Sequence, residues 1–200
     1  MTFLEELREQ RWDDHRYYHH SRVNQSLHLQ SALSFLTAYA LLAVNPVASA
    51  LLGWIVAMWS RQIGHFFFEP KGYDEVNEAT HEHKEDIKIG YNLRRKVVLL
   101  GIWAALPFAL YVNPSLFGLF APHSTGSEYV HNLAVAWLWL GAFAILFRTI
   151  QLAITQDLRT GLVWVTKILT DPFHDVKIYH KSPLYLLRGE LIDPMTHTHR

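Results

Sequence analysis

The stretch HRYYHHSRVNQSLH, which begins at His15, contains four histidines just before a long apolar run. His20, Asn24 and His28 are each four residues apart, so the spacing predicts that they share one face of a continuous helix. His15 and His19 form a second pair at the same spacing. Imidazole nitrogens gathered in this way are typical of a metal site, and we predict His19, His20 and His28 as ligands, with His15 behind them.

The stretch GHFFFE brings a nitrogen and a carboxylate together. His65 and Glu69 are four residues apart, so on a helix both can reach a common ion. Gly64 has no side chain and lets another segment or a ligand approach the backbone closely. The sequence therefore predicts His65 as a metal ligand and Glu69 as a catalytic carboxylate.

A third group of histidines lies in EATHEHKED. His81 and Glu85 would share a helix face, whereas His81 and His83 would share a side only in an extended loop. His174, in TDPFHD, is either a further ligand or a loop residue. We predict His81, His83 and His174 as additional metal ligands and Glu85 as a catalytic carboxylate.

The available ligand types limit the chemistry. The chain has no cysteine, which excludes disulfides, thiolate-ligated haem and a cysteine nucleophile. Imidazole and carboxylate without thiolate suit iron, zinc or manganese. Iron(II) with open positions binds O₂ together with a substrate, whereas zinc polarises water for hydrolysis, and the spacing does not separate the two. Histidines at a membrane surface that bind only headgroups are the remaining alternative.

The elements that must position these residues are apolar helices. All 18 Lys and Arg residues lie outside two windows, 23–60 and 97–147. Each window contains two apolar runs, separated at Asn45-Pro46 in the first window and by a connector that begins at Asn113-Pro114 in the second. The runs lack the polar face of a soluble bundle. We therefore expect an all-α integral membrane protein with four transmembrane helices in two hairpins, 27–65 and 94–150.

Charge and composition give the expected orientation and partners. Half of the 200 residues are hydrophobic and the formal net charge is zero, so nothing indicates binding to nucleic acid. The acidic N-terminal stretch MTFLEELREQRWDDH does not read as a signal peptide. The basic residues place the termini in the cytoplasm by the positive-inside rule, on an inner membrane or the endoplasmic reticulum. We expect residues 1–200 to form one membrane-embedded domain that binds the bilayer and a lipid substrate.

The segment 156–200 is expected to lie in the cytoplasm or at the interface and to cover the site. Pro172 and Pro183 should break it into short pieces, and the terminal THTHR, with His197 and His199, should be a tail.

The hairpin geometry predicts which histidines meet. His28 lies 17 residues before Asn45, and His65 lies 19 residues after Pro46. At the rise of an α-helix these are about 26 and 29 Å from the turn. The two side chains are therefore expected at the same depth on neighbouring helices, which is the arrangement that a metal site between helices requires.

Two motifs resemble those of a known family. YYHHSRVNQSLH and GHFFFEP are similar to the Tyr-His-His…Asn…His and Gly-His-x-x-Phe-Glu motifs of the membrane-bound 2-hydroxy fatty acid dioxygenases, which act in fatty-acid α-oxidation. The resemblance covers about residues 17–77. It implies functional roles for nine positions here: Tyr18, His19, His20, Asn24, His28, Gly64, His65, Phe68 and Glu69.

The same resemblance implies a reaction. Fe(II) would bind the substrate's carboxylate and 2-hydroxyl together with O₂ as co-substrate, and cleavage between C1 and C2 would release a chain one carbon shorter. Catalytic roles for Tyr18 and Asn24 follow from the resemblance. Lys71, Arg61 or the cluster Arg94–Lys96 would attract the carboxylate.

The chain also departs from the family pattern. PKGYDEVNEATHEHKED follows where the family usually has Pro-Ala, and the segment from Thr160 onwards matches no part of it. A di-iron membrane hydroxylase or desaturase is an alternative, because HRYYHH fits the H-x-x-x-H-H box of those enzymes, although only one clean copy is present. A divalent-metal carrier and a non-catalytic membrane protein are further alternatives.

Overall fold

A computed structural model describes residues 1–69, 72–89 and 93–195. Every named element in these residues is a helix, which confirms the predicted all-α class. The elements in order are α1 (Phe3–Tyr18), α2 (Arg22–Leu42), α3 (Pro46–Leu51), the π-helical η1 (Leu52–Met58), α4 (Trp59–Phe67), α5 (His81–Ile87), α6 (Leu93–Val112), α7 (Gly126–Thr155), α8 (Leu158–Tyr179) and α9 (Ser182–Leu187). His197 and His199 lie outside the described residues.

The first hairpin turns where the sequence predicts. Asn45 caps α3, because its side-chain oxygen accepts a hydrogen bond from the Ala48 N–H at 3.0 Å. Pro46 occupies the first turn of α3, where its missing N–H costs nothing. The helix then runs through η1 and α4 to Phe67 without a break and packs along α2.

The second hairpin consists of α6 and α7. A capping box of Thr125 and Glu128 starts α7. Three tryptophans join the two hairpins: the ring of Trp103 stacks on Trp54 and Trp137 with centroids 6.3 and 5.3 Å apart. The Trp54 indole N–H donates to the Trp137 carbonyl at 2.8 Å, so this buried contact has both apolar area and a satisfied polar atom.

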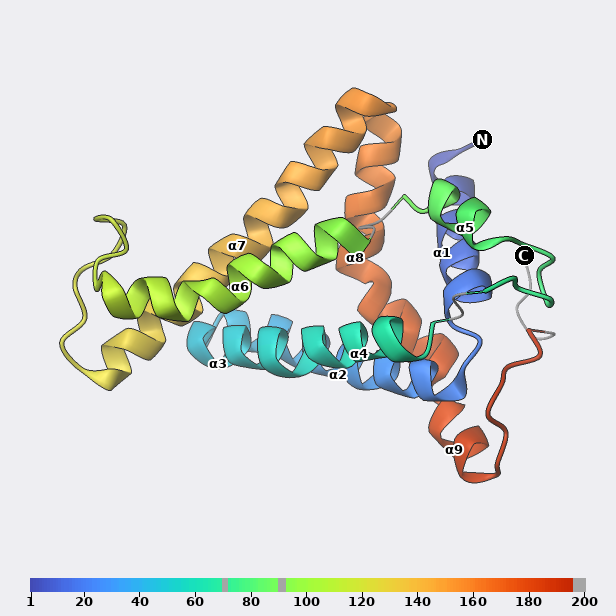
Figure 1. Ribbon diagram of the computed structural model, residues 1–200, viewed down its shortest axis with the longest axis horizontal. Coiled ribbons are helices and arrows are strands. Elements are labelled where there is room, and N and C mark those ends of the chain that lie inside the picture. The colour runs from blue at the N-terminus through green and yellow to red at the C-terminus, as the bar shows by residue number, and fades with distance from the viewer. Residues whose placement is uncertain (70–71, 90–92, 196–200) are drawn as a thin grey trace.

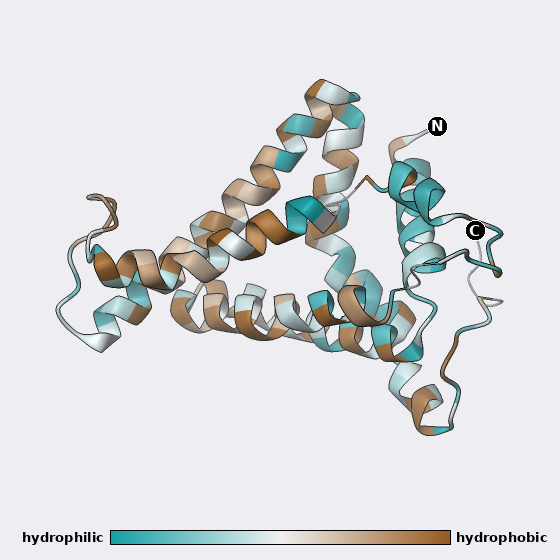
Figure 2. Cartoon of the chain, viewed as in Figure 1, coloured by the Kyte–Doolittle hydropathy of each residue, from teal (hydrophilic) through white to brown (hydrophobic). Residues whose placement is uncertain are grey.

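Two helices are long and apolar enough to cross a membrane, α6 over Arg94–Val112 and α7 over Gly126–Thr155. Figure 2 shows both as predominantly hydrophobic, in contrast to the hydrophilic α1 and α5. By the same measure α2 does not qualify among the described residues. Its first turns contain polar residues that are buried inside the protein, including Arg22, Asn24, Gln25 and His28.

The C-terminal segment differs from the prediction. Pro172 does not break a helix but lies inside α8, fully buried, so packing compensates for the one backbone hydrogen bond that proline removes. The break predicted at Pro183 is confirmed, because α8 ends at Tyr179 and α9, with Pro183 in its first turn, starts at Ser182. Because Val163, Trp164 and Tyr179 on α8 are also almost fully buried, α8 belongs to the core and packs on α2 and α7.

A strap of residues 188–195 then returns to the junction between α1 and α2. The Arg22 N–H donates to the Leu191 carbonyl at 2.9 Å, and the Asp193 N–H donates to the His20 carbonyl at 2.7 Å. Figure 1 shows this strap, α1 and α5 at one end of the molecule, with the turn of the first hairpin and the 113–125 connector at the other. The elements that carry the histidines therefore converge at the end away from the hairpin turns.

Candidate metal centre

Three histidines from separate parts of the chain meet at this end. His19 lies at the C-cap of α1, His28 in the second turn of α2 and His65 near the end of α4. One ring nitrogen of each lies within 4.8 Å of those of the other two. The ring centroids are 4.0 Å apart for His19 and His28, and 4.9 Å apart for His28 and His65. The predicted matched depth of His28 and His65 is confirmed.

Each imidazole has a polar group beside its Nδ1 atom. His19 Nδ1 lies 2.9 Å from the Tyr179 hydroxyl, and His65 Nδ1 lies 2.6 Å from a Glu69 carboxylate oxygen. His28 Nδ1 faces Asp175 at the longer distance of 3.7 Å. Metal-bound imidazoles usually donate their second ring N–H to such partners, which fix the tautomer and direct the other nitrogen to the ion.

Ring nitrogens of this cluster lack hydrogen-bond partners. Among the described residues, Nε2 of His19 and both Nδ1 and Nε2 of His28 are buried and make no hydrogen bond. Burial lowers the pKa of His19 well below its ordinary value, so the imidazole is neutral near pH 7 and has a free lone pair. Buried polar atoms normally have partners, and an acceptor lone pair that has none needs an explanation. A bound metal ion is the explanation that fits three converging neutral imidazoles.

The donor set agrees with the expected metals. Three imidazole nitrogens without thiolate suit iron, zinc or manganese. A three-histidine set leaves coordination positions free for water or substrate, as in catalytic zinc sites. The His19, His28 and His65 cluster could therefore hold a metal ion of this kind.

Tyr179 also connects the cluster to His15. Its hydroxyl lies 2.9 Å from His15 Nδ1 as well as from His19 Nδ1. One hydroxyl can donate to one nitrogen and accept from the other, so a protonated His19 Nδ1 makes His15 Nδ1 the acceptor. Burial lowers the pKa of His15 to about 4, which keeps this ring neutral too. The structure thus places His15 behind the cluster, as expected.

His20 does not lie on the face of His28. The prediction required a continuous helix, but α1 ends at Tyr18 and α2 starts after Ser21, whose hydroxyl caps it. His20 falls in the break and turns away, with Nε2 at the Arg16 carbonyl and 3.4 Å from Asp74. The structure brings His19 to the cluster in its place.

Glu69 lies behind His65 rather than beside it. Its two oxygens are engaged by His65 and by Lys88, whose ammonium is 3.1 Å away. The predicted sharing of one ion by both groups is therefore replaced by a carboxylate–imidazole pair that can hold the ligand in place.

Asn24 and Gly64 define the crossing of α2 and α4. A Cβ atom on Gly64 would overlap the Asn24 side-chain oxygen and approach the His28 ring at 3.5 Å. The predicted close approach at Gly64 is confirmed. The Asn24 amide donates to the Tyr18 carbonyl at 2.8 Å, and the Tyr18 hydroxyl donates to the Lys84 carbonyl. Both residues therefore brace the α1–α2 junction next to His19.

The remaining predicted residues lie apart from the cluster. His81 and His83 are exposed on α5, and His83 meets the edge of Tyr17 at a centroid distance of 6.3 Å. Glu85 pairs with Lys88 at 3.2 Å. His174 is half-buried on α8 and does not belong to the group of three. Phe68, from the resemblance, caps the end of α4.

Sequence reasoning missed the contribution of α8. Lys167, Asp171, Asp175 and Tyr179 are spaced by four residues and are all buried, so they form one polar face of this helix. Such a face inside an otherwise apolar chain is a signal that could have been found. On it, Asp175 pairs with Arg61 at 3.4 Å and Asp171 pairs with Lys167 at 3.3 Å.

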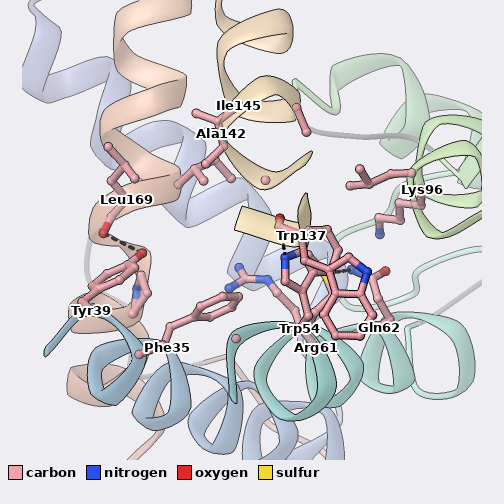
Figure 3. Close-up of a pocket in the computed structure, with 18 of the residues that line it drawn as sticks. Phe35, Tyr39, Trp54, Arg61, Gln62, Lys96, Trp137, Ala142, Ile145 and Leu169 are labelled. Carbon is pink, nitrogen blue, oxygen red and sulfur yellow. Dashed lines mark hydrogen bonds between the residues drawn. The ribbon is translucent and has the colours of Figure 1, made fainter. Parts of the chain in front are cut away.

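A cavity of about 370 Å³ opens beside the cluster. At one end its lining includes His19, His65 and the charged groups Asp14, Arg61, Lys88, Lys96 and Lys167. Most of the rest is apolar, from Phe35 to Leu42 on α2, from Ala50 to Met58 on the facing helix, and on α7 and α8 (Figure 3), with Ser49 and Gln62 as polar exceptions. Ala50 and His65 are separated by roughly 22 Å of helix, so the cavity is long as well as apolar.

The arrangement can hold a metal ion at the charged end of a cavity suited to a chain-like apolar molecule. That is the geometry needed for chemistry on one end of a lipid. Comparison of the chain with protein-family models, with curated proteins and with solved structures found no match.

Proposed function

We propose that the protein is an iron-dependent membrane dioxygenase that shortens 2-hydroxy fatty acids by one carbon. One observation carries the proposal: three neutral imidazoles converge where a long apolar cavity meets a group of cationic side chains. A metal, an acyl chain and a carboxylate can each be bound there at the same time. The resemblance of two motifs to the 2-hydroxy fatty acid dioxygenases supports the choice of reaction.

His19, His28 and His65 would hold the iron, each through one ring nitrogen, and among the described residues Nε2 of His19 and both nitrogens of His28 have no hydrogen-bond partner to displace. When bound, Fe(II) supplies the reactivity toward O₂ that amino-acid side chains lack. Tyr179, Glu69 and, at longer range, Asp175 keep the three rings oriented.

The cavity accounts for the substrate. Its apolar walls remove an acyl chain from water, and the charged end accepts the carboxylate and 2-hydroxyl. One 2-hydroxy acid and one O₂ give the acid one carbon shorter, CO₂ and water, and in this balance all atoms are conserved. Trp54 and Trp137, which both stack on Trp103, form part of the apolar wall of the cavity. Lys71, also predicted to attract the carboxylate, lies outside the described residues.

We further propose that both hairpins span the membrane. Large apolar side chains of the first hairpin are exposed on its outside, among them Leu33, Ile55, Ile63 and Phe67. Such an apolar exterior is costly in water and favourable in lipid. With the basic residues on the cytoplasmic side, both termini lie in the cytoplasm.

The topology can be tested directly because the chain has no cysteine. Thr2→Cys and Ser124→Cys place single thiols at exposed positions at opposite ends of the molecule. A membrane-impermeant maleimide added to intact cells should label the Ser124→Cys protein and leave the Thr2→Cys protein unlabelled until the cells are opened. Labelling of Thr2→Cys in intact cells would refute the orientation.

Metal analysis of the purified protein tests the centre. We expect one iron per chain, with loss of the metal in His28→Ala and His65→Ala and retention in His83→Ala, whose imidazole is exposed on α5. Full metal content in both of the first two variants would refute the centre. Two irons per chain would favour the di-iron hydroxylase, and zinc in place of iron would favour hydrolysis.

Turnover tests the reaction. The iron-loaded protein is mixed with 2-hydroxyhexadecanoic acid without oxygen, and oxygen is then admitted. We expect pentadecanoic acid as the product, no product before oxygen and no shortening of hexadecanoic acid. A product of unchanged length with an added oxygen atom would contradict the proposal.

A further inference from the structure

The charges that line the cavity are not equivalent. Among the described residues, four cationic side chains reach it, and three of them are already neutralised by carboxylates. The pairs are Arg61 with Asp171 and Asp175, Lys88 with Glu69 and Glu85, and Lys167 with Asp14 and Asp171. Lys96 makes no hydrogen bond or ion pair with any residue that the structure describes. Of these four charges, its ammonium is the one that is free to bind an anion.

Lys96 does not simply point to the membrane surface. It lies in the first turns of α6, half-buried, and extends into the cavity (Figure 3). A lysine at the end of an apolar helix usually directs its ammonium outward to water and headgroups. An ammonium that instead lines an apolar cavity is costly unless an anion binds there.

Gln62 provides a second polar group without a full set of partners. It lines the same cavity from α4 and is only 7% exposed. Its side-chain nitrogen contacts the Met58 sulfur at 3.4 Å, and its side-chain oxygen is buried with no hydrogen-bond partner among the described residues. A buried acceptor of this kind calls for a donor from a ligand, such as a hydroxyl group.

We propose that Lys96 and Gln62 form the head-group subsite of the cavity, in which Lys96 binds the carboxylate of a free fatty acid and Gln62 accepts a hydrogen bond from its 2-hydroxyl. The subsite selects the free acid against esters, amides and thioesters, which have no negative charge at this position. It also selects the 2-hydroxy acid against the plain acid. The inference rests on the proposed function only in taking the apolar cavity as the site of an acyl chain.

Binding measured without oxygen separates this inference from turnover. The full-length protein in detergent is titrated with a chain-brominated hexadecanoic acid, its methyl ester and its 2-hydroxy derivative, and quenching of the cavity tryptophans Trp54 and Trp137 reports occupancy. In Lys96→Gln we expect affinity for the acid to fall about tenfold to a hundredfold, the usual effect of losing a charged hydrogen bond, with no change for the ester. Lys96→Arg should restore most of the affinity for the acid.

Gln62→Leu should leave affinity for the plain acid unchanged and reduce the preference for the 2-hydroxy acid about threefold to tenfold, as expected for one neutral hydrogen bond. Lys177→Gln removes a positive charge from the exposed face of α8 and is the matched control, expected to bind all three ligands like the wild-type protein. Unchanged ester binding in each variant shows that the cavity is intact.

The inference is overturned if Lys96→Gln discriminates between acid and ester as well as the wild type does. If discrimination depends on Lys96 but oxygen yields no shortened acid, the subsite stands and the proposed reaction fails. If shortening occurs and discrimination does not depend on Lys96, the reaction stands and the subsite fails.

Discussion

Tyr179→Phe tests whether the hydroxyl behind His19 helps to hold a metal. The tyrosine is 1% exposed, and its oxygen lies between His15 Nδ1 and His19 Nδ1 at 2.9 Å from each. Phenylalanine fills the same space except for one atom, so packing is preserved. The change leaves two imidazole nitrogens without a partner and leaves the His19 ring free to take either tautomer.

The expected losses of metal affinity and of folding free energy follow from these two contacts. Loss of a residue that orients a metal-bound histidine typically reduces metal affinity tenfold to a hundredfold, which corresponds to about 1.4 to 2.7 kcal/mol. Loss of two neutral hydrogen bonds costs about 1 to 3 kcal/mol of folding free energy. We therefore expect a folded variant that binds the metal more weakly, rather than a variant that fails to fold.

The assay is a competition titration between the protein in detergent and a chromophoric chelator of known affinity. Tyr39→Phe is the matched control, since Tyr39 is 40% exposed and its hydroxyl donates to the Leu169 carbonyl at the long distance of 3.4 Å. If Tyr179→Phe binds metal as tightly as the wild type while His28→Ala does not bind it, the role of Tyr179 in orienting His19 is wrong.

Three further predictions concern the same end of the molecule. Gly64→Ala should destabilise the protein by about 1 to 3 kcal/mol, because the added methyl group displaces the Asn24 side chain, and thermal unfolding in detergent measures this. Glu69→Gln should reduce metal affinity about tenfold or more in the competition titration, because the amide holds the His65 N–H less strongly than the carboxylate. The free energy of unfolding of the metal-free protein should fall by about 3 kcal/mol from His15 alone when the pH is lowered from 6.5 to 4. Over this range His15 takes up a proton in the unfolded chain, whereas in the folded protein burial lowers its pKa to about 4 and the ring stays largely neutral.

Each of these predictions has a control in the same chain. Gly101→Ala adds a methyl group where nothing lies within 4 Å and should not destabilise the protein. Glu85→Gln changes a carboxylate that pairs with the same lysine as Glu69 but has no histidine, so metal affinity should be unchanged. His15→Gln should flatten the pH dependence. A wild-type unfolding free energy that stays constant from pH 6.5 to 4 would contradict the assignment of a buried neutral His15.

The pairing of His28 with His65 could be predicted from the sequence because it depends only on the position of the hairpin turn and on the rise per residue of a helix. Asn45-Pro46 sets the turn of a hairpin, and the rise of a helix sets the distance from that turn. Antiparallel helices of equal length then bring residues at equal distances to the same depth. No information about the rest of the chain is needed.

The position of His20 could not be predicted in this way. Four-residue spacing defines a shared face only while the helix continues, and the helix is interrupted by the cap at Ser21. Serine is a favoured N-cap residue, so Ser21 could have been expected to start a new helix. Whether a helix starts there depends on how α1 packs against α8. This is a non-local contact and cannot be read from neighbouring residues.

The role of α8 shows the same limit. The four-residue series that ends at Tyr179 was visible, yet Pro172 favoured a break in the middle of it. Burial of Pro172 and the ion pairs of Asp171 and Asp175 hold the helix together across that point, and these depend on partners more than one hundred residues away.

His81 and His83 are predicted as ligands but lie apart from the cluster. A high local density of histidine in the sequence does not place the side chains near His19, His28 and His65.

The strap of residues 188–195 has a consequence for the order of biosynthesis. His19 is synthesised early, but the groups that fix its position are synthesised late. The Tyr179 hydroxyl contacts the His19 ring, and the Asp193 N–H donates to the carbonyl of the next residue, His20. The Asp193 carboxylate also accepts a hydrogen bond from the Gln25 side chain, which donates to the His19 carbonyl at 2.8 Å as well. On the ribosome, both hairpins are therefore synthesised before the His19 side chain can be fixed in place. A metal ion held as proposed by His19, His28 and His65 would be bound only after the whole chain has been made.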